Sequence, residues 1–153
     1  MPTNLKEQIT FNILMVIVMV YALVCYNMSF EMGGLNNNIF SLALIELPIM
    51  GTIAFILEML FVGKISKKIT FSLLNPKETQ PIFITIFISS IIVCFMCPLM
   101  SFFATILFNF NGLDSLFSTW LTLCVRNFPM ALLFQIFFAG PFVRFLFKKI
   151  FKK

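Results

Sequence analysis

The chain has 153 residues, of which 60% are apolar and 11% are charged, and its formal net charge is +5. A soluble domain carries about a quarter charged residues, and a chain this small cannot hide so much apolar surface from water. The 22 phenylalanines exclude disorder, because disordered chains are poor in aromatic residues. The composition therefore excludes an ordinary soluble enzyme and indicates an integral membrane protein.

Four long apolar stretches follow one another along the chain. Each approaches or exceeds the roughly 20 residues that a helix needs to cross the hydrocarbon core of a bilayer. We expect membrane-spanning helices at residues 9–30, 39–62, 81–108 and 116–140. β-Barrel strands are excluded, because these runs are continuously apolar instead of alternating. The sequence thus predicts an all-α membrane protein that forms a single domain over residues 1–153.

Basic residues gather in three places between and beyond these stretches. They are Lys6 near the N-terminus, a basic inner loop at residues 63–80, and a basic C-terminal tail at residues 142–153. Short segments rich in Lys and Arg stay in the cytoplasm, so a multi-pass membrane protein with both termini cytoplasmic is predicted. The net charge then reflects topology and contact with anionic lipid. The lipid bilayer is the expected partner, and nucleic acid is not.

The tail allows two interpretations. It is expected to continue the fourth helix along the membrane interface, with its lysines reaching the headgroups. The alternative is an amphipathic segment that senses lipid or binds a partner.

The second half of the chain resembles the first in sequence. An offset of 71 places the first predicted helix on the third, and an offset of 77 aligns Glu58 with Gln135 and Gly63 with Gly140 in the second and fourth. Self-similarity of this kind is the signature of repeated structural units.

These offsets predict two parallel tandem hairpin repeats, at residues 4–69 and 75–146. Each repeat has two spans, so both enter the membrane from the same side. The pseudo-twofold axis should therefore lie along the membrane normal, unlike the axis of an inverted repeat.

Several short motifs accompany the repeat. They are Met1-Pro2-Thr3-Asn4, Tyr26-Asn27, Glu46-Leu-Pro-Ile-Met, Phe55-Ile-Leu-Glu58, Val62-Gly63-Lys64, Cys97-Pro-Leu-Met-Ser101, Asn127-Phe-Pro-Met-Ala131 and Phe138-Ala-Gly-Pro-Phe-Val-Arg144. In these motifs the chain resembles the small bacterial membrane proteins grouped as domain of unknown function 2798. The resemblance implies a bacterial plasma-membrane protein with a duplicated hairpin, and it brings no activity, substrate or cofactor. Arg126 is not part of the family pattern.

Charged residues inside the predicted spans need an explanation, because each costs roughly 2.5–3.5 kcal/mol on insertion scales. Glu58 lies close to the predicted inner end of its helix, and we expect it to pair with a lysine. For Glu46 and Arg126, which lie deeper, we expect a structural ion pair. Two alternatives remain: Glu46 alone could couple to protons or cations, or Arg126 could bind a substrate anion.

Thr119 and Thr122 share a polar face with Arg126. Ordinary hydrogen bonding between helices explains such a face, and one wall of a narrow polar path is the alternative. The candidate intramembrane polar site is Glu46, Arg126, Thr122, Thr119, Asn127 and Glu58.

The cysteines are expected to pack. Ser90, Cys94, Cys97, Ser101 and Thr105 recur at helical spacing, which predicts a face of small side chains that lets helices approach closely in lipid. A reactive thiol needs a helix N-terminus or a nearby cation, and these thiols lie mid-helix. The chain has no histidine. We therefore predict no catalytic residues, no metal and no cofactor, and a protein that is not an enzyme.

Two functions remain. The first is an oligomeric transporter or channel for a small solute or ion. The second is an accessory, regulatory or structural membrane protein that binds a larger membrane complex. In both cases we expect a homo-oligomer or a membrane-protein partner.

Overall fold

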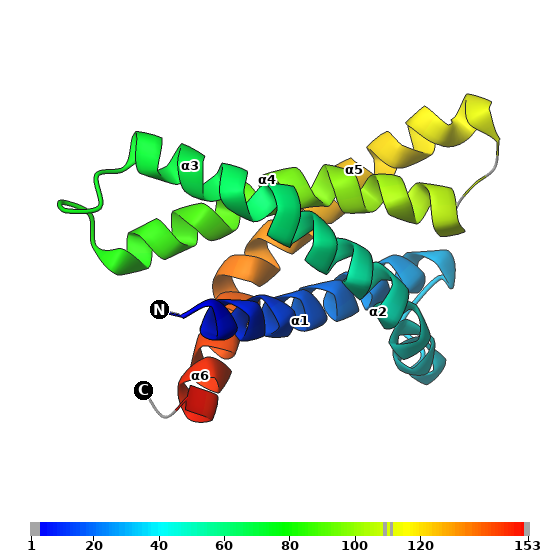
Figure 1. Cartoon of the computed structure of the whole chain (residues 1–153). Helices are drawn as coiled ribbons and strands as arrows, with labels where there is room; N and C mark the ends of the chain where they lie inside the picture. Colours follow the sequence, from blue (N-terminus) through cyan, green and yellow to red (C-terminus); the bar gives the residue numbers. More distant parts are fainter. Residues whose placement is uncertain (1–3, 109, 111, 152–153) are drawn as a thin grey trace.

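The computed structural model describes residues 4–108, 110 and 112–151, and within that part it is all helical (Figure 1). Its elements are α1 (Leu5–Glu31), α2 (Asn37–Leu57), η1 (Glu58–Val62), α3 (Gly63–Leu73), α4 (Pro81–Phe108), α5 (Leu113–Phe134), η2 (Gln135–Ala139) and α6 (Gly140–Phe151). Four helical stretches are long and apolar enough to cross a membrane. The predicted all-α fold with four spans is confirmed.

The second and fourth spans are longer than the sequence indicated. They run continuously over Asn37–Leu73 and Leu113–Phe151. The prediction of a loop at residues 63–80 is wrong over α3, since only residues 74–80 connect α3 to α4. The lysines there do not break the helix, because Ser66 and Thr70 bury one face and leave the charged face exposed. The tail continues the fourth span as α6, as the sequence predicts.

The helices exchange partners along their length. The helix α1 packs along α2, and α4 packs along α5, whereas α3 packs on α4 and α6 packs on α1. The chain therefore forms a crossing from which two helix pairs diverge on either side (Figure 1). We call the end that holds the α1–α2 and α4–α5 connections the outer end, and the opposite end the inner end.

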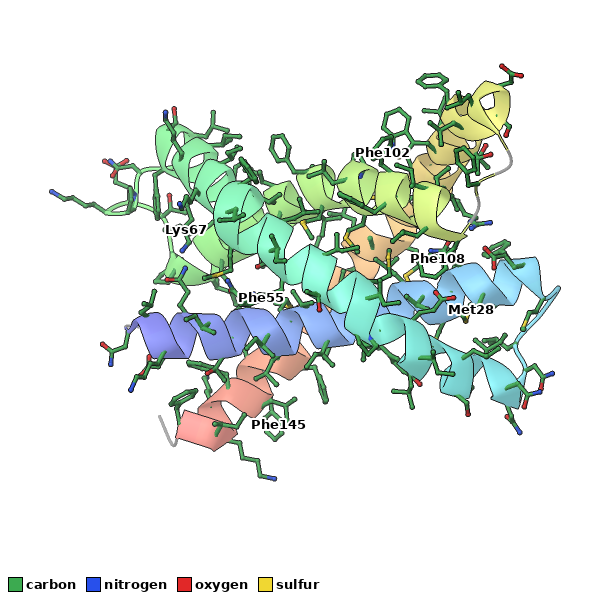
Figure 2. The ribbon with its side chains drawn as sticks, turned by 45° about the vertical axis from the view of Figure 1, so that its right-hand side comes forward. Met28, Phe55, Lys67, Phe102, Phe108 and Phe145 are labelled. Atoms are coloured by element: carbon green, nitrogen blue, oxygen red, sulfur yellow. The ribbon has the colours of Figure 1, made fainter. Side chains whose placement is uncertain are left out.

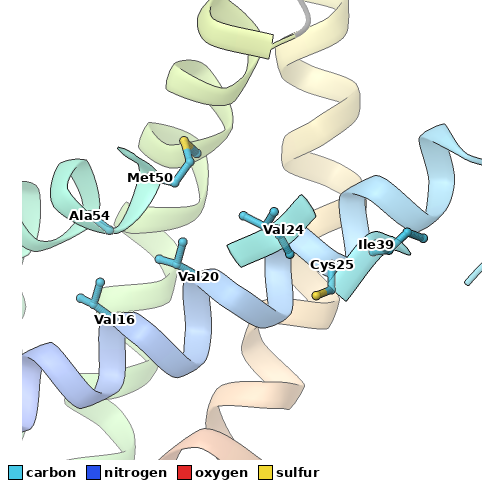
Figure 3. Close-up of a cluster of buried hydrophobic side chains, with 8 residues drawn as sticks. Val16, Val20, Val24, Cys25, Ile39, Met50 and Ala54 are labelled. Carbon is cyan, nitrogen blue, oxygen red and sulfur yellow. The ribbon is translucent and has the colours of Figure 1, made fainter. Parts of the chain in front are cut away.

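Apolar side chains fill the space between helices and also cover the outside. Val16, Val20, Met50 and Ala54 belong to one buried cluster (Figure 3). Phenylalanines project outward all round the molecule (Figure 2), and Phe138, for example, is 66% exposed. A surface so rich in exposed apolar residues fits lipid and not water.

Buried positions recur 77 residues apart. In α1 and α4, Val16 and Val93 are both buried, and so are Val20 and Cys97. An offset of 71 pairs none of the buried residues of these two helices, so 77 is the offset that the structure supports here. Buried residues of the second and fourth spans match at the same distance: Ala54 with Ala131, Glu58 with Gln135, Val62 with Ala139, and Ser66 with Val143.

The two π-helical segments, η1 and η2, occupy matching places. In each, the amide of the glycine that follows donates to the first carbonyl of the segment, Gly63 to Glu58 and Gly140 to Gln135. A Cβ on Gly63 would lie 2.8 Å from that carbonyl oxygen, and a Cβ on Gly140 would lie 2.9 Å from its counterpart. Each wide turn therefore depends on a glycine at its end.

Candidate ion site at the outer end

A small cavity lies between α1, α2, α4 and α5 on the outer side of the crossing. Its volume is about 40 Å³, which is enough for two or three water molecules. Its lining comes from both halves of the chain: Val24, Asn27, Met28, Glu31, Glu46, Met50, Ala104, Phe108 and Leu123.

The polar groups of this outer cavity all come from the first half of the chain. Asn27 and Glu31 belong to α1, and Glu46 belongs to α2. The residues 77 positions further on also line the cavity, but they are apolar: Ala104, Phe108 and Leu123. The cavity thus has one wall of oxygen ligands and one wall of hydrocarbon.

Two carboxylates line this cavity, and among the described residues no basic side chain pairs with them. Glu46 is half-buried, and Glu31 is close enough to act on it electrostatically. Within the part of the chain that the structure describes, neither forms an ion pair within 4 Å. Like charges at short range repel, so the site favours a cation between them.

The predicted ion pair between Glu46 and Arg126 does not form. The Nη2 atom of Arg126 instead donates to Oδ1 of Asn27 at 2.7 Å, and its guanidinium lies 4.7 Å from the centre of the Phe30 ring. The hydroxyl of Tyr26 donates to the backbone oxygen of Arg126 at 3.5 Å. The reason is packing: α5 lies against α1, so α1 supplies the partners of Arg126 before α2 can.

The remaining polar residues of α5 do not line the cavity. Thr122 is exposed, and its hydroxyl donates to the oxygen of Ser118 in its own helix at 2.8 Å. Thr119 is half-buried. Asn127 is buried, and its Oδ1 atom has no hydrogen-bond partner within the described chain. Among the described residues, Thr122 therefore neither makes the expected hydrogen bond between helices nor forms part of a polar path at the cavity.

Glu58 is buried, with only 7% of its surface exposed, at the start of η1. Lys67 acts on it electrostatically, but no ion pair closer than 4 Å joins them. Two side-chain amides of the inner half donate to methionine sulfurs. Asn12 donates to Sδ of Met59 at 3.7 Å, and Gln135 donates to Sδ of Met15 at 3.6 Å. The expected pairing with a lysine is therefore a longer-range interaction.

The cysteines lie mostly in packed interfaces, and all four are free thiols. Cys97 is buried and donates to the backbone oxygen of Cys124 at 3.8 Å. The predicted face of small residues is correct for Cys97, Ser101 and Thr105, whereas Cys94 is exposed and Ser89 is buried in place of Ser90. Over residues 4–108, 110 and 112–151, no three His, Cys, Asp or Glu side chains gather as metal ligands would.

Two residues at this site are not among the predicted candidates. Glu31 lies on the last turn of α1, just beyond the predicted span at residues 9–30, and Asn27 lies within that span, which was predicted as continuously apolar. The sequence does offer one sign that Asn27 has a role, because its side-chain amide is polar and lies near the end of an otherwise apolar span. Interhelical hydrogen bonds often involve such side chains.

The fold defines the class: this is an all-helical, multi-pass membrane protein. The chain belongs to the family described as Domain of unknown function (DUF2798), whose sequence model matches residues 77–151. It is 35% identical to the "Uncharacterized protein YybC" of Bacillus subtilis (strain 168) over 99% of this chain and 96% of the relative. The resemblance seen in the sequence is confirmed. No solved structure matches the chain.

Proposed function

We propose that the protein carries a small cation across the bacterial plasma membrane and that the outer cavity is its binding site. One observation carries this proposal: the half-buried Glu46 and the exposed Glu31 line the same small cavity, while the nearby cation, Arg126, is held by Asn27 instead. Carboxylates inside a membrane protein are expensive and mark ion pathways. Here they are available for cargo.

The size and lining of the cavity limit the cargo. A volume of about 40 Å³ accepts a hydrated proton or a monovalent cation with one or two waters. The hydrocarbon wall of Ala104, Phe108 and Leu123 offers no donor or acceptor from its side chains, so cation contacts come from one side. Glu58, buried at the start of η1, supplies a third carboxylate for a cation moving inward.

The test is flux into liposomes that contain the purified protein alone. We expect cation-dependent flux in the wild type and a fall of about tenfold or more in Glu46→Gln, equivalent to a loss of ~1.4 kcal/mol of binding. Glu78→Gln is the matched control, because Glu78 lies in the connection between α3 and α4. An accessory role predicts no flux above that of empty liposomes, together with a membrane protein that co-purifies.

We also propose that both termini are cytoplasmic. The basic residues support this orientation, because those of α3 and α6 lie at the inner end with the start of α1 (Figure 1). A reporter active only outside the cytoplasm should stay silent when fused to the C-terminus and become active in the connection between α1 and α2. The reverse pattern would overturn the orientation.

We further propose that the chain is a tandem duplication with its axis along the membrane normal. The offset of 77, the reciprocal packing of α3 on α4 and α6 on α1, and a family match over about one repeat length support it. An experimental structure should superpose residues 4–69 on residues 81–146 by a rotation of about 180° around the normal. An axis in the membrane plane would contradict the proposal.

Oligomerisation completes the proposal. Four helices around so small a cavity enclose little volume, and a groove of about 350 Å³ between α1 and α2 is lined mainly by apolar residues. Mass measurement in lipid nanodiscs should show more than one copy per particle. A strictly monomeric protein that transports would show that oligomerisation is dispensable.

A further inference from the structure

The two π-helical segments differ in their charges although their backbones match. The segment η1 begins with the carboxylate of Glu58, and η2 begins at the matching place with the neutral carboxamide of Gln135. A cation follows each on the next helix, Lys67 on α3 and Arg144 on α6, again 77 residues apart. In the first half Lys67 has a buried carboxylate on which it acts. In the second half that carboxylate is missing.

Within the residues that the structure describes, Arg144 forms no ion pair within 4 Å. Its guanidinium folds back over the turn, so that Nη2 lies 3.7 Å from where a Cβ of Gly140 would stand. Its Nε atom is buried and has no hydrogen-bond partner within the described chain. A guanidinium has five donors in a planar fork that matches a phosphate, and in this one the described residues leave the Nε donor unpaired.

The surroundings of Arg144 suit a lipid better than a soluble anion. Phe145 and Ile150 on the same helix are 65% and 55% exposed, and such side chains lie against acyl chains. Lys148 and Lys149 are exposed on the last turns of α6. Basic residues at the end of a membrane helix attract anionic headgroups. Charge and apolar surface thus occur together, as in a phospholipid.

We propose that Arg144 binds the phosphate of an anionic phospholipid at the inner end of the molecule, beside η2. The lipid supplies the negative charge that Gln135 lacks. This site is separate from the outer cavity, and its existence does not depend on cation transport.

The experiment measures retained lipid by native mass spectrometry after delipidation and exposure to phosphatidylglycerol, phosphatidylcholine or inorganic phosphate. We expect the wild type to retain phosphatidylglycerol over phosphatidylcholine. Arg144→Gln should weaken retention about tenfold or more. Lys148→Gln on the exposed face should weaken it by about fivefold at most, and Arg144→Lys should fall between them, because it keeps the charge and loses the fork.

A charge-neutral exchange gives the sharpest test. The double variant Glu58→Gln with Gln135→Glu keeps the net charge but places a carboxylate at the start of η2, where it can act on Arg144 as Glu58 acts on Lys67. We expect it to lose phosphatidylglycerol about as strongly as Arg144→Gln does. Each new side chain is one that the matching segment already contains. Unchanged retention in the exchange variant, or equal losses in Arg144→Gln and Lys148→Gln, would overturn the proposal. Full displacement by inorganic phosphate would overturn the lipid as its occupant.

Discussion

Positions 77 residues apart in the two halves of this chain are often buried alike but differ in charge. At matching positions the first half has Glu31 and Glu46 where the second has Phe108 and Leu123. The second half has Arg126 where the first has an isoleucine. Small and apolar positions such as Ala54 and Ala131 stay buried in both. Burial therefore recurs at these matched positions, whereas charge does not.

This division explains why the outer cavity is one-sided. An arrangement with carboxylates in both halves would bring four negative groups together, at a large cost in a medium of low dielectric constant. With Glu31 and Glu46 on one wall and hydrocarbon on the other, the cavity brings together only two negative groups of the described chain. Substitutions at matched positions test whether the two halves respond alike.

The largest effect is expected at the glycines that end the two π-helical segments. In Gly63→Ala and Gly140→Ala a new Cβ meets a backbone oxygen at 2.8 and 2.9 Å, so each should lower the free energy of unfolding by about 1–3 kcal/mol. Unfolding in mixed detergent, followed by circular dichroism, measures it. Gly51→Ala is the control, because its nearest neighbour would be a side-chain carbon of Val16 at 4.0 Å.

Equal losses at Gly63 and Gly140 would support a common packing plan in the two halves. A variant at either position that behaves like Gly51→Ala would show that its turn relaxes to an ordinary α-helix. The halves would then differ in backbone as well as in charge.

A smaller effect is expected at Asn27. Asn27→Leu removes the acceptor that holds Arg126 at 2.7 Å and should destabilise the protein by about 1 kcal/mol, as hydrogen bonds between membrane helices do. Asn12→Leu is the matched control on the same helix, since Asn12 donates only to a thioether, at 3.7 Å. If both variants lose the same amount, the bond between the halves at Arg126 adds no special stability.

The smallest effect is expected at Phe30. Its ring centre lies 4.7 Å from the guanidinium of Arg126, and a cation–π contact at an exposed site contributes about 0.5–1 kcal/mol. Phe30→Leu should lose that amount in the wild type and little when Arg126 is already Gln. Phe83→Leu, at another exposed phenylalanine, is the control. If the losses of stability in Phe30→Leu and Arg126→Gln simply add in the double variant, the ring and the guanidinium do not interact.

The sequence was sufficient for the four spans, because continuous apolar stretches have few alternatives in a membrane. It was not sufficient for the ends of the second and fourth spans. The lysines of α3 read as a loop, although a helix tolerates them wherever one face stays buried against a neighbour. The 77-residue offset could be seen in the second and fourth spans, but in α1 and α4 only burial distinguishes it from 71.

From the sequence alone follow four stretches long and apolar enough to cross a membrane, the assignment to the DUF2798 family, and the need to explain Glu46, Glu58 and Arg126. Only the tertiary structure decided their partners. Depth along a helix can be counted from the sequence, but the partner of a side chain depends on which helix faces it. Because α5 packs on α1, Arg126 meets Asn27, and Glu46 is left facing the outer cavity with Glu31.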